Sequence, residues 1–250
     1  MIKEEIRKKY PSIKFQELEK YKTYYNDRYH SRLEPKLRRN EDVESLHLGF
    51  NGIKFLLLSL QRSRLLFDGF LNALNTNQIP VAFLAVRAHY ESTGSVSYFL
   101  LNLRRYYSRE ITFNKIDDLL FKLSVGSRDF PERDINRDSI VWPDAINVLT
   151  QIEKADNLFT EMSQTNVEPF INSYNPLSEF CHPNLLGLTI GSHIDGKKGI
   201  VVFDKEPIYE EHDYGLLINK FIISCNFFFI VYDRCFSLIK ENEVMPELIK

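Results

Sequence analysis

The hydrophobic positions of the chain recur at helical spacing over most of its length. In residues 44–74, apolar side chains fall three to four residues apart or at multiples of that spacing, at Phe50, Ile53, Leu57, Leu60, Leu65 and Phe67. Residues 79–107 open with an apolar run that covers every side of a helix, and such a helix is normally enclosed by others. These patterns predict two long helices, the second of them near the centre of a bundle.

The link between the two segments predicts how the helices are arranged. It consists of Asn75-Thr76-Asn77-Gln78, and Pro80 follows in the first turn of the second helix, where proline is tolerated. A link this short joins antiparallel neighbours. We therefore expect an antiparallel helical hairpin, which is the natural nucleus of a bundle.

Shorter patterns complete an all-α helical bundle with a small β-hairpin insertion. Helices are predicted at residues 15–29, 114–123, 145–162, 174–182 and 214–240, the last being apolar enough to be a central member. In residues 187–204, β-branched runs flank a turn that contains Gly196 and Gly199, which predicts the hairpin. The charged stretch 126–138 is expected to be a surface loop.

Charge is distributed unevenly along the 250 residues. The whole chain carries 32 basic and 34 acidic residues, a net charge of −2, so it has no overall field that attracts nucleic acid or membranes. Residues 1–40, however, hold 12 basic against 6 acidic residues. We divide the chain into a basic helical arm, residues 1–40, and a bundle domain, residues 41–250. The arm is either a solvated surface or a contact for RNA or an acidic partner.

Several function classes are disfavoured by what the sequence lacks. The three cysteines have no metal-ligand spacing, which indicates reduced thiols and a cytoplasmic protein, and the six histidines form no metal motif. Neither glycine-rich phosphate motif is present, so no cofactor is expected, and no GxSxG elbow supports a hydrolase. The longest apolar run, residues 221–232, is shorter than the roughly 20 residues that span a bilayer. We predict no membrane insertion.

Arg87 and Glu91 are the first candidate site residues, because they lie one helical turn apart in the apolar helix. An arginine that loses water there needs a carboxylate or other acceptors. In one interpretation the two residues form a buried ion pair that fixes the register of the helix. In the other, Arg87 holds a phosphate or carboxylate and Glu91 orients the guanidinium. Both interpretations can hold together.

His182 is the second candidate, at a predicted helix end just before Pro183. It is either a structural histidine or a general base, since its proton affinity is easily tuned near neutral pH. As a base it would deprotonate a ribose 2′-hydroxyl while Arg87 stabilised the charge on phosphate, which is RNA cleavage without a metal. The candidate catalytic pair is thus Arg87 and His182, with a supporting polar network of Glu91, Ser178, Glu179 and Asn184.

Arg104, Arg105 and Tyr106 interleave basic and aromatic side chains near the end of the same long helix. This composition suits base stacking combined with phosphate contact, so these residues are a candidate nucleic-acid contact. The alternative is a surface cap that complements the helix dipole.

The segment Leu-Ser-Glu-Phe-Cys-His-Pro-Asn, residues 177–184, also resembles a known signature. Together with Gly187, Asn147, Asp156 and the Arg87-x-x-x-Glu91 pair, it resembles a bacterial family of helical proteins marked by Leu-Ser-Glu-x-x-His-Pro-Asn. More distantly, the two long helices and the Arg-plus-His pair are similar to the HEPN superfamily. Its members include metal-free ribonuclease toxins, phage-defence effectors and non-catalytic nucleotide-binding modules.

These observations lead to two hypotheses for function. The resemblance to HEPN proteins implies a nucleic-acid-acting or nucleotide-binding protein, including a metal-free ribonuclease of a defence or toxin system, with RNA or a nucleotide as ligand and a homodimer as its assembly. The alternative is a non-enzymatic protein-interaction module in which the same arginine, glutamate and histidine are structural.

Overall fold

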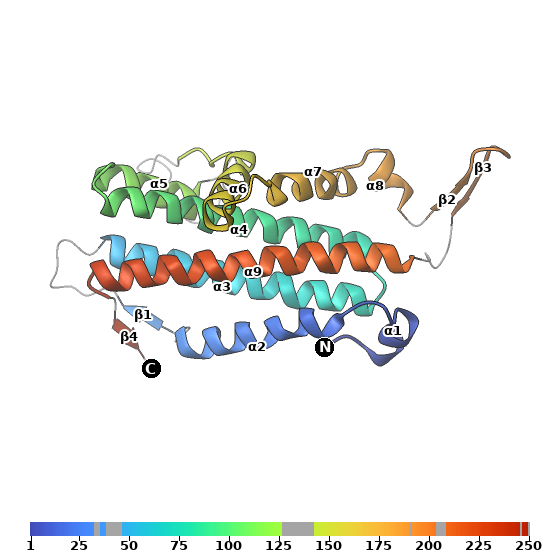
Figure 1. Ribbon diagram of the computed structural model, residues 1–250, viewed down its shortest axis with the longest axis horizontal. Helices are drawn as coiled ribbons and strands as arrows, with labels where there is room; N and C mark the ends of the chain where they lie inside the picture. The colour runs from blue at the N-terminus through green and yellow to red at the C-terminus, as the bar shows by residue number, and fades with distance from the viewer. Residues whose placement is uncertain are drawn as a thin grey trace, which may run out of the picture.

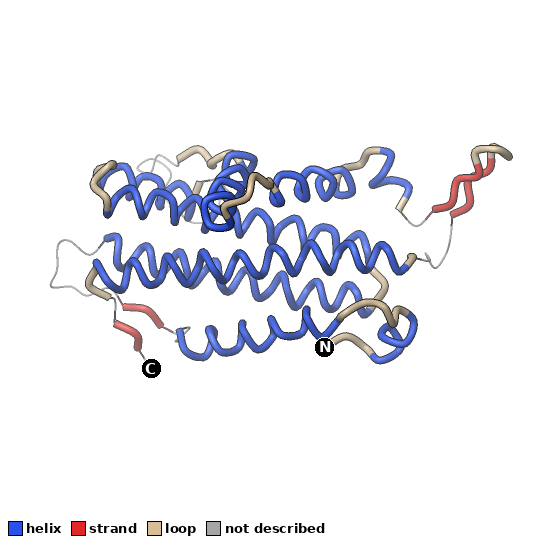
Figure 2. The backbone as a smooth tube through the Cα atoms, viewed as in Figure 1, coloured by secondary structure: helices blue, strands red, loops and turns tan. Residues whose placement is uncertain are grey.

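Long helices lie side by side through most of the molecule, and a small β-hairpin projects from one end (Figures 1 and 2). The computed structural model describes residues 1–32, 36–38, 47–126, 143–190, 192–203, 209–245 and 247–249. The helices are α1 (Glu4–Lys9), α2 (Phe15–Arg32), α3 (His47–Asn75), α4 (Ile79–Tyr107), α5 (Phe113–Val125), α6 (Val148–Ser163), α7 (Pro169–Cys181), α8 (Leu185–Thr189) and α9 (Glu211–Asn242). The predicted fold class, an all-α bundle with a β-hairpin, is confirmed.

Within the described ranges, the strands form two small antiparallel pairs. The predicted hairpin consists of β2 (Ser192–Asp195) and β3 (Ile200–Phe203), with Ile194 opposite Val201 and Ser192 opposite Phe203. A second pair, β1 (Lys36–Arg38) with β4 (Glu247–Ile249), joins segments far apart in sequence. We did not expect this pair, because three-residue strands are too short to show an alternating pattern.

The core lies where α4 and α9 run alongside each other. Helix α4 also contacts α3, α5, α6 and α7, while α2 and α3 contact α9 from the other side (Figure 1). This explains why α4 is apolar on nearly every face, since almost every face has a helical neighbour. Its first turns are the most open apolar part, where Val81 and Leu84 are about half exposed.

Several helices begin at positions other than those expected, and the contacts at the start of α6 and α7 explain two of these differences. Helix α6 starts at Val148 and not at residue 145, because the Asn147 side chain accepts the backbone N–H of Leu149 and caps the helix there. Helix α7 starts at Pro169, ahead of the expected residue 174. Its first N–H groups, those of Phe170 and Ile171, donate to the carboxylate of Asp156 at 2.8 Å each. The capping group comes from another helix, so no local pattern marks the start of α7.

The signature segment forms the turn from α7 to α8. Asn184 caps α8 by accepting the N–H of Gly187, and its amide donates to the Glu179 carboxylate. A Cβ on Gly187 would overlap the His182 carbonyl oxygen, so only glycine fits at this position. The Glu179–Asn184 hydrogen bond, the Asn184 cap and the close backbone approach at Gly187 therefore fix the turn between the two helices.

The N-terminal segment packs onto the bundle as far as the structure describes its side chains. Ile2, Ile6, Phe15, Leu18 and Tyr25 are buried in the same core as the long helices. The expected division after residue 40 falls among residues 39–46, outside the described part of the chain. The expected surface loop, residues 126–138, also lies outside it beyond Gly126.

Helix α9 extends on both sides of the apolar run from which it was predicted. Among the described residues it is the one helix that is long and apolar enough to cross a membrane, with a mean hydropathy of 1.7 in its most apolar window. In the structure 56% of that window is buried. Burial of this kind is also found in the core helix of a bundle.

Candidate functional site

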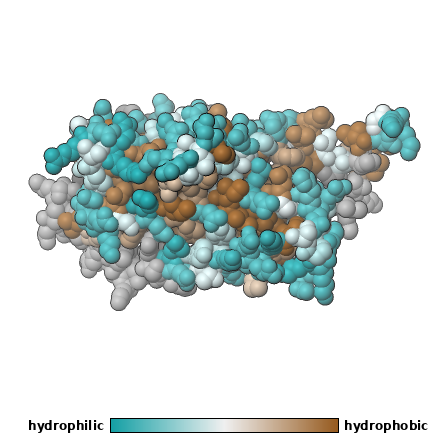
Figure 3. Space-filling model, in the orientation of Figure 1, coloured by the Kyte–Doolittle hydropathy of each residue, from teal (hydrophilic) through white to brown (hydrophobic). Residues whose placement is uncertain are grey.

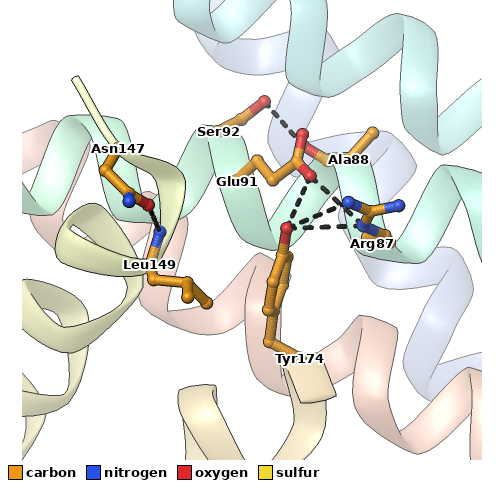
Figure 4. Close-up of polar contacts among 7 residues, drawn as sticks. All are labelled: Arg87, Ala88, Glu91, Ser92, Asn147, Leu149 and Tyr174. Atoms are coloured by element: carbon orange, nitrogen blue, oxygen red, sulfur yellow. Dashed lines mark hydrogen bonds and ion pairs between the residues drawn. The ribbon is translucent and has the colours of Figure 1, made fainter. Parts of the chain in front are cut away.

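Arg87 and Glu91 meet, as their spacing predicts, and Tyr174 of α7 joins them (Figure 4). The Arg87 Nε lies 3.4 Å from the Glu91 Oε1, and the Tyr174 hydroxyl donates to the same oxygen at 3.0 Å. The Arg87 Nε and Nη2 donate to the Tyr174 hydroxyl oxygen at 3.4 and 3.3 Å. The three side chains form a closed triangle that ties α7 to α4.

This triangle is partly open to solvent. The side chains of Arg87 and Glu91 are 25% and 27% exposed, so the ion pair forms but is half-buried. Burial works against the charge of Arg87, but Tyr174 and Glu91 more than offset it and raise the pKa of the guanidinium. For the Tyr174 hydroxyl the effect of burial has the opposite sign, and it raises the pKa. The arginine stays charged and is already engaged by two protein groups.

His182 lies outside this triangle. It follows the last residue of α7, and its backbone N–H donates to the Ser178 carbonyl oxygen. Its side chain is exposed and makes no hydrogen bond or ion pair with any residue that the structure describes. Its neighbour Cys181 does reach Arg87. Burial raises the pKa of the Cys181 thiol, and the charge of Arg87 partly opposes this by lowering it. No contact therefore joins the two candidate catalytic residues within the described part of the chain.

The other members of the expected network have separate positions. Glu179 and Asn184 bind each other in the α7–α8 turn. The hydroxyl oxygen of Ser178 is buried and has no hydrogen-bond partner among the described residues, so it does not donate to His182. The structure thus brings together Arg87 and Glu91, and separately Glu179 and Asn184, but not the whole predicted set.

Arg104, Arg105 and Tyr106 lie at the far end of α4, about 25 Å from Arg87 by the rise of a helix. Arg104 pairs with Glu161 at 2.8 Å and Arg105 with Glu110 at 3.5 Å. The Tyr106 ring contacts Tyr107 and Phe113. Each of these side chains has a protein partner.

A cavity of about 380 Å³ opens beside the triangle, between α3, α4, α5 and α6. Glu91 lines it, and so do Arg62 of α3 and Ser92 of α4. The Arg62 Nε donates to the Ser92 hydroxyl at 3.1 Å, and that hydroxyl donates to the Ala88 carbonyl at 3.0 Å (Figure 4 shows the second bond). The sequence did not single out Arg62, because an arginine on an otherwise amphipathic helix is normally a surface residue.

The remaining walls of the cavity are mixed. Further polar groups come from Ser59, Ser95, Ser124 and Gln151, and apolar walls from Phe55, Leu58, Leu123 and Val148. Ser95 donates to the side chain of Gln151 across the α4–α6 contact. A Cβ on nearby Gly94 would lie 3.0 Å from the backbone of Gln151, so glycine allows the two helices to approach this closely.

Comparison of the chain with protein-family models, curated proteins and solved structures finds no match.

A second polar cluster, which sequence reasoning missed, lies sealed in the core. His89 of α4 is fully buried, with its Nε2 2.7 Å from the Ser63 hydroxyl and 3.0 Å from the Tyr25 hydroxyl. Its Nδ1 lies 2.7 Å from the Ser224 hydroxyl. Burial, assisted by the nearby charge of Arg62, lowers the pKa of His89 to about 3. This neutral imidazole joins α2, α3, α4 and α9 and is closed to a ligand.

We expect Tyr174→Phe to destabilise the protein by about 1 kcal/mol, because the variant loses the hydroxyl that bridges Arg87 and Glu91. Urea denaturation followed by circular dichroism measures the loss. Tyr98→Phe on α4 is the matched control, since the Tyr98 hydroxyl has no hydrogen bond within the described residues. Equal stabilities for the two variants would mean that the triangle does not hold α7 in place.

Proposed function

We propose that this bundle binds a nucleotide in the cavity between α3, α4, α5 and α6, without cleaving it. Among the activities that the resemblance to HEPN proteins implies, this is non-catalytic nucleotide binding. The observation that carries it is Arg62, a guanidinium on the cavity wall that is held by Ser92 and has no carboxylate partner among the described residues. An arginine in this position suits a phosphate, whose oxygens match its planar fork.

The charge around the cavity supports an anionic ligand. Glu91 also lines the cavity, but Arg87 and the Tyr174 hydroxyl already bind its carboxylate. The guanidinium groups of Arg62 and Arg87 carry two positive charges, and Glu91 neutralises one of them. One positive charge is therefore left to bind the ligand. A larger cavity, about 650 Å³ between the α1–α2 link and α9, is lined by Lys14 but also by Glu17 and Glu211, and it suits an anion less well.

The size and the walls of the cavity fit a nucleotide better than a free phosphate ion. Its volume lies within the range of roughly 300–1,000 Å³ that small-molecule sites occupy. Phe55, Leu58 and Leu123 supply apolar surface for a base, while Ser59 and Ser124 supply hydroxyls for a ribose. A free phosphate would use Arg62 and leave the apolar wall without a ligand.

Binding is favoured over cleavage because of where His182 lies. A general base must reach the proton that it removes, within hydrogen-bonding distance or through one water. His182 is exposed beyond the end of α7 and is not among the described residues that line the cavity. We therefore expect the purified protein to leave RNA intact in the absence of metal, and His182→Ala to bind nucleotide as the unmodified protein does.

Arg62→Gln should weaken nucleotide binding about tenfold or more, since a charge-assisted hydrogen bond contributes roughly 1.5–3 kcal/mol. Titration with a fluorescent adenine nucleotide, followed by anisotropy, measures the affinity. Arg64→Gln is the matched control: it removes the same charge two residues along α3, from an arginine that pairs with Asp68 at 3.8 Å and does not line the cavity. Equal affinities for both variants, or no binding by the unmodified protein, would refute the proposal.

A further inference from the structure

The β2–β3 hairpin and α8 expose an unusual amount of apolar surface at one end of the molecule. All four residues of β3 are exposed, and Phe203 retains 81% of its accessible surface. In α8, Leu185 and Leu188 are 72% and 70% exposed. Figure 3 shows apolar side chains gathered over this end of the molecule, around the base of the projecting hairpin. We refer to α8 and the hairpin together as the terminal apolar surface.

This surface is large enough to need a cover. The exposed parts of its eight large apolar residues, on α8 and on both faces of the hairpin, amount to roughly 800 Å² in total, about what one partner contributes to a standard protein interface. The eight are Leu185, Leu186, Leu188, Ile194, Ile200, Val201, Val202 and Phe203. An isolated two-stranded hairpin is marginal in water, and monomers rarely expose continuous apolar patches larger than a few hundred Å².

The strand β3 offers an edge that nothing protects. One of its edges pairs with β2, and the other has no strand beside it within the described residues. Natural edge strands are usually protected by a charge, a proline or a bulge. The sequence Ile-Val-Val-Phe contains no charge and no proline, and it has high strand propensity. The outer backbone groups of β3 are therefore suited to pairing with another strand.

We propose that the partner is a second copy of this chain, bound by antiparallel pairing of β3 with β3 around a two-fold axis. The two hairpins would then form one four-stranded sheet with β3 of each copy in the middle. Antiparallel pairing of a strand with itself is self-complementary, as a two-fold interface requires. The axis passes through Val202, so that Phe203 of one copy lies beside Val201 of the other on the face that also carries Ile194.

The distribution of charge favours a second copy. The central strands of the sheet would carry no charge, so two identical strands meet without repulsion. Lys197 and Lys198 lie in the hairpin turn, where Lys198 pairs with Asp195 at 3.3 Å. In an antiparallel arrangement the two turns lie at opposite ends of the paired strands, so the lysines of the two copies are kept apart.

Val202→Lys tests the proposal, because it places two like charges opposite each other at the two-fold axis. Sedimentation equilibrium over a wide concentration range should show a dimer for the unmodified protein and a monomer for the variant, with unchanged circular dichroism. Leu65→Lys is the matched control. Leu65 is 64% exposed on α3, far from the hairpin in sequence, so this substitution should leave the dimer intact. A monomeric unmodified protein, or a Val202→Lys variant that still dimerises, would overturn the inference.

A cysteine at the two-fold axis gives a second test, which traps the dimer and does not disrupt it. Directly opposed residues in antiparallel strands have Cα atoms about 4.5–5.5 Å apart, a separation that a disulfide can span. Val202→Cys should therefore form a covalent dimer under mild oxidation, whereas Leu65→Cys should not. If the protein is instead monomeric and floats with lipid vesicles, the terminal apolar surface binds lipid and the proposed dimer is wrong.

Discussion

Lowering the pH from 7 to 5 should destabilise the protein by about 2 kcal/mol through His89 alone. The folded protein holds this imidazole neutral, with a pKa of about 3, because it is buried in the core beside the charge of Arg62. The unfolded chain, by contrast, gains a proton as the pH falls through the usual histidine pKa of about 6.5. Stability contributed by His89 is therefore complete above pH 6.5 and is lost as the pH falls towards 3, by about 1.4 kcal/mol for each unit.

Carboxylates also titrate in acid, so the contribution of His89 has to be isolated by difference. Urea denaturation at pH 7 and pH 5 should show a smaller loss for His89→Gln than for the unmodified protein. Glutamine can still hydrogen-bond to Ser63 or Ser224, which favours folding of the variant. NMR offers a check without mutation: the imidazole signals of His89 should not move between pH 7 and 5. Signals that titrate near pH 6.5 would show that the core admits the charge.

Asp156→Ala should cost about 2–3 kcal/mol, because two backbone N–H groups at the start of α7 lose their acceptor. Asp156 is buried, with 4% of the residue exposed, and burial raises its pKa in spite of the two N–H groups that donate to the carboxylate. No water replaces it easily, so the loss should exceed that of an exposed cap. Thermal and urea denaturation measure the change.

Asp156→Asn is the informative control for this prediction. Its amide keeps one acceptor oxygen of the same size, so the loss should be clearly smaller than for alanine. Because Asp156 fixes the beginning of α7, alanine should also speed proteolysis around residues 164–169 more than asparagine does. Identical stabilities for the two variants would mean that α7 begins at Pro169 for another reason.

The sequence predicted best what depends on local pattern. The bounds of α4 agree with the expected helix at both ends, because its apolar run begins just after the Asn-rich link, beside Pro80, and ends at a basic terminus. The ion pair of Arg87 with Glu91 follows from helical spacing alone. These features require only contacts within one element.

Features that depend on contacts between residues far apart in the sequence could not be predicted from local patterns. The cap of α7 comes from Asp156 in another helix, and Tyr174 reaches Arg87 across 87 positions of the chain. Both depend on how the helices pack, which the spacing of residues within one helix does not fix. The same is true of Arg62, which is exposed and lines a cavity only because α4, α5 and α6 supply the other walls.

His182 and His89 show which sequence signals indicate a functional or buried polar group. His182 drew attention because it lies in a signature, yet its side chain is exposed and unpartnered within the described residues. His89 lies in the apolar stretch of α4, and Ser224 interrupts the longest apolar run of the chain. Small polar residues inside apolar helices indicate a shared buried network, because each needs a partner there. The pattern therefore carried the information for a core network.

Because α9 is the last long helix in the sequence, the hydrophobic core can be completed only late in synthesis. The helices that surround it, α2, α3 and α4, leave the ribosome before it does. Until α9 arrives, the nascent chain has an incomplete core, with rings such as Phe67, Phe70 and Tyr25 lacking the aromatic partners that α9 provides. Transiently exposed apolar surface of this kind promotes aggregation. This bundle should therefore depend on chaperones while it is being translated, and fold cooperatively only once residue 242 has emerged.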